Sequence, residues 1–206
     1  MDHKETVKTG YNAIANQYLE GRTKKSRGIQ LLEAFMSKLP ADAKVLDAGC
    51  GAGIPVAQIL SREFSVTGVD FSEAQIELAK KNVPNATFIF QDITQLDFPE
   101  DHFEGICSYY AIIHIPREEH RALLENLYRM LKPGGTALLC LGADDLPDDT
   151  HSFHGNQMYW SHYDAGTNQS MLTKIGFHII LSKIVLDETY GGQHLFVLAQ
   201  KGNKQE

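Results

Sequence analysis

Three acidic residues lie in or at the end of short apolar segments, an arrangement typical of the ligand-binding edge of a parallel sheet. Asp47 lies in VLDA, Asp70 ends VTGVD and Asp92 ends FIFQD. The carboxyl ends of parallel strands meet at one edge, where open α/β sheets bind ligands, and an acid there accepts hydrogen bonds from ribose hydroxyls. Each acid also suits a helix N-cap, an alternative that the sequence leaves open.

A glycine-rich turn directly follows the first of these segments. Gly49, Gly51 and Gly53 alternate along it, and without Cβ atoms they let a ligand approach the backbone closely. Residues 54–60 then predict a helix whose first amides face the turn. The spacing differs from the dinucleotide pattern G-x-G-x-x-G, and Asp47 would repel a pyrophosphate but attract an ammonium or sulfonium group. The turn therefore predicts a nucleotide-like ligand that carries positive charge.

His114 is the residue best suited to proton transfer, because it follows a fourth apolar segment at residues 103–110. A neutral imidazole there can act as a general base toward an oxygen, nitrogen or sulfur acceptor. Its apolar surroundings equally suit a structural histidine that is hydrogen-bonded to the backbone. Tyr109 and Tyr110 end the same segment and are expected to line the pocket, whereas His120 is expected on the surface of the next helix.

Residues 144–163 combine aromatic and histidine side chains in what reads as a loop. An apolar aromatic wall with a few polar groups suits a small organic acceptor. His151 and His154 form an H-x-x-H pair, but they do not lie on a clear helix and no third ligand has a characteristic spacing, so we predict no metal site. The expected acceptor-binding residues are Tyr110, His114, His154, Tyr159 and Trp160.

The N-terminal region predicts an amphipathic helix with Tyr11, Ile14 and Tyr18 on one face. Such a helix has no place inside the sheet, and we expect it to cover the ligand and exclude water. Ordinary aromatic packing of the two tyrosines is the alternative. The basic residues within 21–28 read either as a solvated connection or as a means of steering an anionic acceptor.

Together these motifs resemble the class I S-adenosylmethionine-dependent methyltransferases over about residues 40–142. The carriers are the acid and alternating glycines, the acids that end the second and third strands, and K-P-G-G at 132–135 as the tight turn before the fifth strand. The resemblance implies S-adenosylmethionine as cofactor, S-adenosylhomocysteine as product and no metal. The cofactor-binding residues that it implies are Asp47, Gly49, Gly51 and Gly53 for the methionine and ribose part, Asp70 and Phe71 for the ribose side, Asp92 and the Ile93 amide for adenine, and Tyr11, Tyr18 and Tyr109 around the methionine end.

The family's fold is a doubly wound, Rossmann-like α/β architecture with helices on both faces of the sheet. The resemblance implies seven mostly parallel strands, with an antiparallel C-terminal hairpin strand inserted between the fifth and the sixth. The expected later elements are helices at 117–130 and 168–175 and strands at 177–186 and 194–200. K-P-G-G would end the first of these helices.

Composition limits the remaining possibilities. The 206 residues, 43% of them hydrophobic, suit one domain at 1–206, with a helical lid (1–38), a cofactor-binding core (39–142) and an acceptor-side loop, helix and hairpin (143–206). A net charge of −7 argues against nucleic acid as a partner. The sequence shows no secretory signal and no membrane-spanning run, which predicts a cytoplasmic protein. Cys50, Cys107 and Cys140 are expected to be reduced core thiols.

The sequence thus predicts transfer of a methyl group from S-adenosylmethionine to an O, N, S or C nucleophile of a small-molecule acceptor. The main contribution of the protein to the rate of this transfer is expected to be the positioning of the two reactants for in-line attack. Two alternatives stay open at this point. One is a nicotinamide-dependent oxidoreductase on the same scaffold, and the other is a non-catalytic S-adenosylmethionine-binding protein. Oligomeric state does not follow from the sequence.

Overall fold

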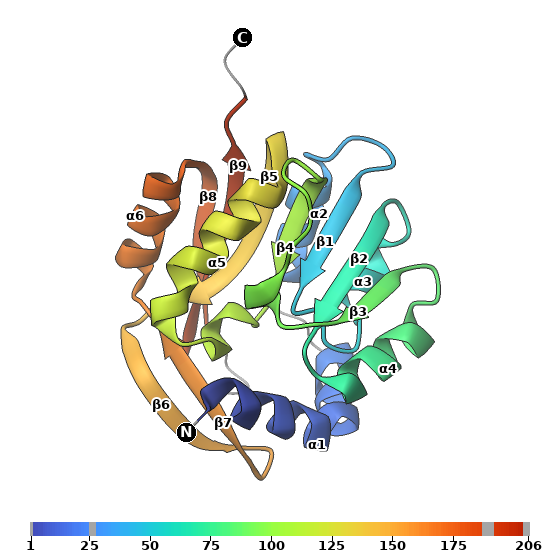
Figure 1. Ribbon diagram of the computed structural model, residues 1–206, viewed down its shortest axis with the longest axis vertical. Helices are drawn as coiled ribbons and strands as arrows, with labels where there is room; N and C mark the ends of the chain where they lie inside the picture. The colour runs from blue at the N-terminus through green and yellow to red at the C-terminus, as the bar shows by residue number, and fades with distance from the viewer. Residues whose placement is uncertain (1, 25–27, 187–191, 204–206) are drawn as a thin grey trace.

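The computed structural model describes residues 2–24, 28–186 and 192–203 and is built around a seven-stranded sheet (Figure 1). Its strand order is β3-β2-β1-β4-β5-β9-β8, and β9 runs antiparallel to both of its neighbours while the other pairs are parallel. The predicted doubly wound fold is confirmed, including the last strand inserted between the fifth strand and β8. The strands are β1 (Lys44–Ala48), β2 (Ser65–Asp70), β3 (Thr87–Phe90), β4 (Phe103–Ser108), β5 (Leu131–Gly142), β8 (Phe177–Leu186) and β9 (Gln193–Lys201).

Helices cover both faces of the sheet, and each face has its own apolar core. In β1, Leu46 packs into one core and Val45 into the other, because successive side chains of a strand point to opposite faces. One core holds α5 (Arg117–Met130) and α6 (Ala165–Ile175), and the other holds α2 (Ile29–Met36), α3 (Val56–Leu60) and α4 (Glu73–Asn82). Short 3-10 helices occur at η1 (Ile93–Gln95) and η2 (Ile112–His114).

Helix α1 (His3–Lys24) lies across the carboxyl ends of the strands, as Figure 1 shows. Its buried residues Val7 and Ile14 pack against Met158 and Tyr159. At Gly10 an added Cβ would lie 2.6 Å from the Met158 sulfur, so glycine permits the close approach of α1 to this segment. The predicted helix outside the sheet is therefore present. The basic cluster at 21–28 falls on residues whose side chains lie outside the described part of the chain, except for Gly28.

The segment at 144–163, expected to be a loop, is instead a β-hairpin of β6 (Leu146–Phe153) and β7 (Asn156–His162). His154 and Gly155 connect the strands with φ values of 50° and 82°, as a two-residue type I′ turn requires. The loop prediction was wrong because β6 is mostly exposed and lacks the apolar alternation of a half-buried strand. Packing of β7 against α1 supplies the missing burial.

Two further expectations need correction. K-P-G-G does not precede the fifth strand as a separate turn but lies within β5 as a bulge, since Phe103 pairs with Leu131 while Gly105 pairs with Thr136. His120 is buried rather than on the surface of α5, and its Nε2 lies 2.9 Å from the Ile115 carbonyl oxygen.

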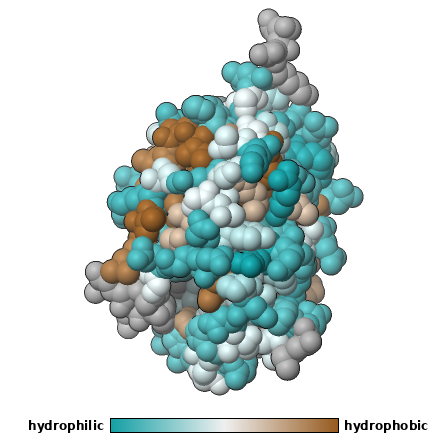
Figure 2. Space-filling view, turned by 90° about the vertical axis from the view of Figure 1, so that its left-hand side faces the viewer, coloured by the Kyte–Doolittle hydropathy of each residue, from teal (hydrophilic) through white to brown (hydrophobic). Residues whose placement is uncertain are grey.

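Strand β8 forms one edge of the sheet and leaves several apolar side chains partly exposed. Hydrophobic patches are visible on the face shown in Figure 2, which views the molecule from the left-hand side of Figure 1. The exposed large apolar residues of β8 are Ile180, Leu181, Ile184 and Leu186.

Among the described helices, none combines the length and the apolar character needed to cross a membrane.

One buried amide joins the two ends of the hairpin insertion. Asn168 in α6 is fully buried, and its Nδ2 donates to the carbonyl oxygens of Gly142 at 2.9 Å and Tyr163 at 2.8 Å. Gly142 precedes β6 and Tyr163 follows β7. Asn168 therefore fixes the base of the hairpin at the end of β5.

We expect Asn168→Ala to lower the free energy of unfolding by roughly 1–3 kcal/mol, because two carbonyl groups lose their donor. Urea denaturation followed by circular dichroism measures the change. Ser170→Ala, two residues further along the same helix and exposed, is the matched control and should leave stability nearly unchanged. Equal stability of the two variants would show that Asn168 does not fix the hairpin base.

Candidate active site

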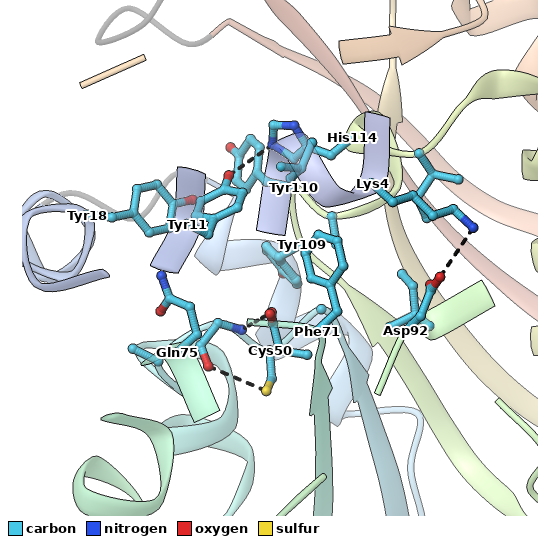
Figure 3. Close-up of a pocket in the computed structure, with 18 of the residues that line it drawn as sticks. Lys4, Tyr11, Tyr18, Cys50, Phe71, Gln75, Asp92, Tyr109, Tyr110 and His114 are labelled. Carbon is cyan, nitrogen blue, oxygen red and sulfur yellow. Dashed lines mark hydrogen bonds and ion pairs between the residues drawn. The ribbon is translucent and has the colours of Figure 1, made fainter. Parts of the chain in front are cut away.

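A cavity lies beneath α1 at the carboxyl ends of β1, β2 and β4 (Figure 3). Elements far apart in the sequence meet there, as expected for the edge of a parallel sheet. Its lining residues are Lys4, Val7, Tyr11, Tyr18, Leu19, Gly49, Cys50, Gly51, Ala52, Ile54, Asp70, Phe71, Gln75, Asp92, Ile93, Tyr109, Tyr110, Ala111, His114 and Ile115.

Glycine occupies the three positions of the loop for different structural reasons. Gly49 has φ 80°, and an added Cβ would lie 2.1 Å from the Ala111 Cβ, so its role is close packing against the residue that precedes η2. At Gly51 the nearest atom to an added Cβ is Gln75 Oε1 at 3.7 Å. Gly51 is therefore the position where the missing side chain keeps the cavity open. Gly53 does not line the cavity and packs near Val83 instead.

Asp70 lies at the end of β2 and holds the glycine loop. Its Oδ2 accepts a hydrogen bond from the Gly51 amide at 2.9 Å, and its Oδ1 accepts one from the Ser72 amide at 2.9 Å. Burial raises the pKa of Asp70 to about 6, although the backbone hydrogen bonds act in the opposite direction. This carboxyl group therefore titrates close to neutral pH at the cavity wall.

Asp92 lies at the other end of the cavity and caps η1. Its Oδ1 accepts from the Thr94 amide at 2.8 Å, so the N-cap alternative is confirmed for this acid. Its Oδ2 lies 3.2 Å from the Lys4 ammonium, which also donates to Glu119 at 2.5 Å. Burial lowers the pKa of Lys4, but the hydrogen bond to Glu119 and the charge of Asp92 outweigh it and raise the pKa. Sequence analysis missed Lys4, because nothing in the helix pattern signals its distant acidic partners.

Asp47 does not line the cavity, in contrast to the other two acids. It is buried in β1, an inner strand of the sheet, and its Oδ1 lies 3.6 Å from the Cys107 sulfur. Burial raises the pKa of the Cys107 thiol well above its usual value, and the Asp47 charge adds to the effect. Cys107 is therefore a protonated donor. All three cysteines are free and buried, which confirms the expected core thiols.

His114 combines the two roles that the sequence left open, one at each ring nitrogen. Its Nδ1 lies 2.7 Å from the Tyr159 carbonyl oxygen, which can only accept, so we assign the proton to Nδ1. Nε2 then accepts from the Tyr11 hydroxyl at 2.9 Å. Burial lowers the pKa of His114 to about 4, while the hydrogen bond to Tyr159 acts in the opposite direction. The ring is thus neutral at pH 7, with an unprotonated Nε2 that can accept a hydrogen bond.

A second cavity adjoins the first and lies between α1, the hairpin and the start of β9. The two cavities share four lining residues, which are Tyr11, Tyr18, Tyr110 and His114. Its other described lining residues are Ile113, Asp144, Asp145, Leu146, His151, Phe153, Trp160, His162, Gly192, Gln193 and His194.

The expected acceptor residues are brought together only in part. Trp160 lines the second cavity, and His151 stacks on it with ring centroids 3.9 Å apart. Tyr159 stacks instead on His3, and it meets the site through its carbonyl oxygen. His154 lies in the hairpin turn and lines neither cavity. Among the described residues, no group of three or more His, Cys, Asp or Glu side chains is placed to hold a metal ion.

Tyr109 and the cavity floor complete the site. The Tyr109 hydroxyl donates to the Gly28 carbonyl oxygen at 3.2 Å, and burial raises the pKa of this phenol. Phe71 and Ile93 line the first cavity beside Asp70 and Asp92. Of the expected cofactor residues, only Asp47 and Gly53 are absent from its described lining.

Comparison with known proteins assigns the family. Residues 45–135 match the sequence profile of a family described as "Methyltransferase domain". Over 185 residues the chain is 30% identical to phosphoethanolamine N-methyltransferase of Plasmodium falciparum, which covers 86% of this chain and 66% of that protein. Over 200 residues it is 28% identical to phosphoethanolamine N-methyltransferase 1 of Triticum aestivum, covering 91% of this chain but only 39% of that protein. The chain thus spans less than two thirds of the length of both curated relatives.

A solved structure shows the same fold. The 1,6-didemethyltoxoflavin-N1-methyltransferase of Burkholderia thailandensis, determined with bound 1,6-didemethyltoxoflavin and S-adenosylhomocysteine, superposes with a TM-score of 0.74 at 21% sequence identity. The match covers 95% of this chain and 87% of that one. Taken together, the profile, the relatives and the fold place the chain among the class I S-adenosylmethionine-dependent methyltransferases.

The described cavity fits S-adenosylmethionine, the cofactor of this family. Gly51 leaves open the space that a side chain would fill, and Asp70 presents a buried carboxylate at the same wall. Phe71 and Ile93 add an apolar surface suited to a flat base. A nicotinamide dinucleotide would bring a pyrophosphate beside Asp70, and Lys4, the cationic side chain in the described lining, is already paired with Asp92 and Glu119.

Affinity for S-adenosylhomocysteine is expected to fall as the pH drops through about 6, because Asp70 loses the negative charge that accepts hydroxyl donors. Below that pH the loss should approach roughly tenfold per pH unit. Calorimetric titration between pH 5 and 8 measures it. Asp70→Asn should bind weakly at every pH. Wild-type affinity that stays constant over this range would contradict the assignment, as would an Asp70→Asn curve parallel to that of the wild type.

Proposed function

We propose that this protein transfers the methyl group of S-adenosylmethionine to a small-molecule acceptor held in the second cavity. The observation that carries the proposal is the shared wall of Tyr11, Tyr18, Tyr110 and His114 between two adjoining cavities. Methyl transfer needs two ligands held in contact with water excluded. An aromatic wall beneath a covering helix supplies both conditions.

In this proposal the glycine loop, Asp70, Phe71, Asp92 and Ile93 bind the cofactor. When bound, it supplies an electrophilic methyl group on a positively charged sulfur. Helix α1 covers the bound ligand, and Lys4 ties the start of α1 to Asp92 and Glu119. Tyr109 lines the same cavity and is held in place by its hydrogen bond to the Gly28 carbonyl oxygen.

Tyr11 and His114 are proposed as the proton-accepting pair. As the acceptor becomes methylated, it releases a proton to the Tyr11 oxygen while Tyr11 passes its own proton to Nε2 of His114. The low pKa of His114 keeps Nε2 unprotonated above about pH 4. The Tyr159 carbonyl holds the ring in the orientation that presents Nε2 to Tyr11. His114 is the general base in this scheme.

The acceptor is proposed to be a small organic molecule with an O, N, S or C nucleophile. Relatives named for phosphoethanolamine and for a sterol show that members of this family differ in acceptor. Tyr110, His151 and Trp160 supply the aromatic surface of the second cavity. A cytoplasmic location, the absence of a nucleic-acid partner and the division of the chain at residues 38 and 142 stay predictions.

Calorimetric titration with S-adenosylmethionine, S-adenosylhomocysteine and NADH tests the cofactor before any acceptor is known. Selective binding of the first two supports the proposal, and binding of NADH alone would overturn it. An acceptor panel, with S-adenosylhomocysteine formation detected by mass spectrometry, then separates an enzyme from a protein that only binds the cofactor.

With an acceptor in hand, we expect Tyr11→Phe and His114→Ala each to lower kcat by about 10²- to 10⁴-fold, the usual contribution of acid–base groups. Affinity for S-adenosylhomocysteine should fall far less than kcat, because both side chains border the first cavity only at the wall that it shares with the second. Tyr128→Phe, the same substitution outside both cavities, is the matched control. Unchanged kinetics in the first two variants would remove the proton-transfer role.

A further inference from the structure

Gln75 has an unusual environment for a glutamine. It lies in the first turn of α4, where its backbone amide donates to the Ser72 hydroxyl at 3.3 Å, and its side chain is only 1% exposed. Among the described residues, neither Nε2 nor Oε1 of Gln75 has a hydrogen-bond partner. A buried amide without partners destabilises the folded protein. Such a group in the wall of a cavity points to a ligand that completes its hydrogen bonds.

The position of Gln75 within the cavity indicates which part of a ligand it meets. Its Oε1 is the atom nearest to the open side of Gly51, in the middle of the glycine loop. In Figure 3, Gln75 lies beside Cys50 and below Tyr18, on the opposite side of the view from Asp92. If adenine lies at Asp92, Gln75 lies at the methionine end.

The chemistry of the neighbouring groups agrees with that end. Asp47, the acid expected to attract the ammonium group, does not line the cavity. The acids that do line it only accept hydrogen bonds when ionised, so neither can donate to a carboxylate. A side-chain amide offers a donor and an acceptor together, which matches the carboxylate and the ammonium of an amino acid.

We propose that Gln75 binds the amino-acid part of S-adenosylmethionine, with Nε2 donating to its carboxylate and Oε1 accepting from its ammonium. This proposal rests on the proposed function. It assigns the recognition of the amino-acid part to α4 rather than to the acid at the end of β1. It also explains why a buried polar side chain lies at this wall.

The test compares two ligands in the Gln75→Met variant. S-adenosylhomocysteine contains the amino-acid part, whereas 5′-methylthioadenosine lacks it. We expect the Kd for S-adenosylhomocysteine to rise roughly 10- to 100-fold, the range for hydrogen bonds to charged groups, and the Kd for 5′-methylthioadenosine to change less than twofold. The melting temperature without ligand should equal or exceed that of the wild type, because the unpaired amide is removed.

Gln58→Met in α3, outside the described lining of the first cavity, is the matched control and should bind both ligands normally. Gln75→Leu should reproduce the ligand-selective loss. The ratio of the two Kd values is insensitive to partial unfolding, which weakens both ligands equally. Unchanged binding of S-adenosylhomocysteine overturns the proposal, and so does an equal loss for both ligands. A wild-type protein that binds neither S-adenosylmethionine nor S-adenosylhomocysteine would instead contradict the proposed function.

Discussion

The Asp70 carboxylate is the group on which the geometry of the site depends. One oxygen holds the Gly51 amide and the other holds the Ser72 amide, so a single side chain joins the glycine loop to the start of α4. Gly51 and Gln75 lie on either side of that junction, Gly51 in the loop and Gln75 in the first turn of α4. The same burial that makes these hydrogen bonds strong disfavours the charged form and moves the pKa of Asp70 toward neutrality.

Helix α1 is attached to the site at both ends of the first cavity and to α4. Lys4 pairs with Asp92, Tyr11 donates to His114, and the Asn12 side-chain oxygen accepts from the Ser72 hydroxyl and the Ala74 amide. Asp92 and His114 line the first cavity, and Ser72 and Ala74 lie at the start of α4. The packing of α1 therefore both covers the cavity and organises its polar groups. Displacement of α1 would remove Lys4 from Asp92 and Tyr11 from Nε2 of His114 at the same time.

The sequence predicted the framework well because strand ends, glycine spacing and helix periodicity are local signals. The helix at 117–130 and the strand at 177–186 have the predicted bounds, and Asp70 lies where its place at a strand end indicated. The hairpin was missed because the burial of β7 comes from α1, which is distant in the sequence. Lys4 and Gln75 were missed for the same reason, since their significance depends on partners, or on missing partners, that only the tertiary structure defines.

In the proposed mechanism the hairpin links acceptor binding to proton transfer through His114. Trp160 of β7 lines the second cavity, and the carbonyl group of the preceding residue fixes the protonated nitrogen of His114. A neutral imidazole has one basic nitrogen, so fixing Nδ1–H decides that Nε2 faces Tyr11. Any shift of β7 that reshapes the acceptor wall must also turn or release the base. The proposed mechanism therefore couples acceptor selection to proton transfer, because residues of one strand, β7, contribute to both.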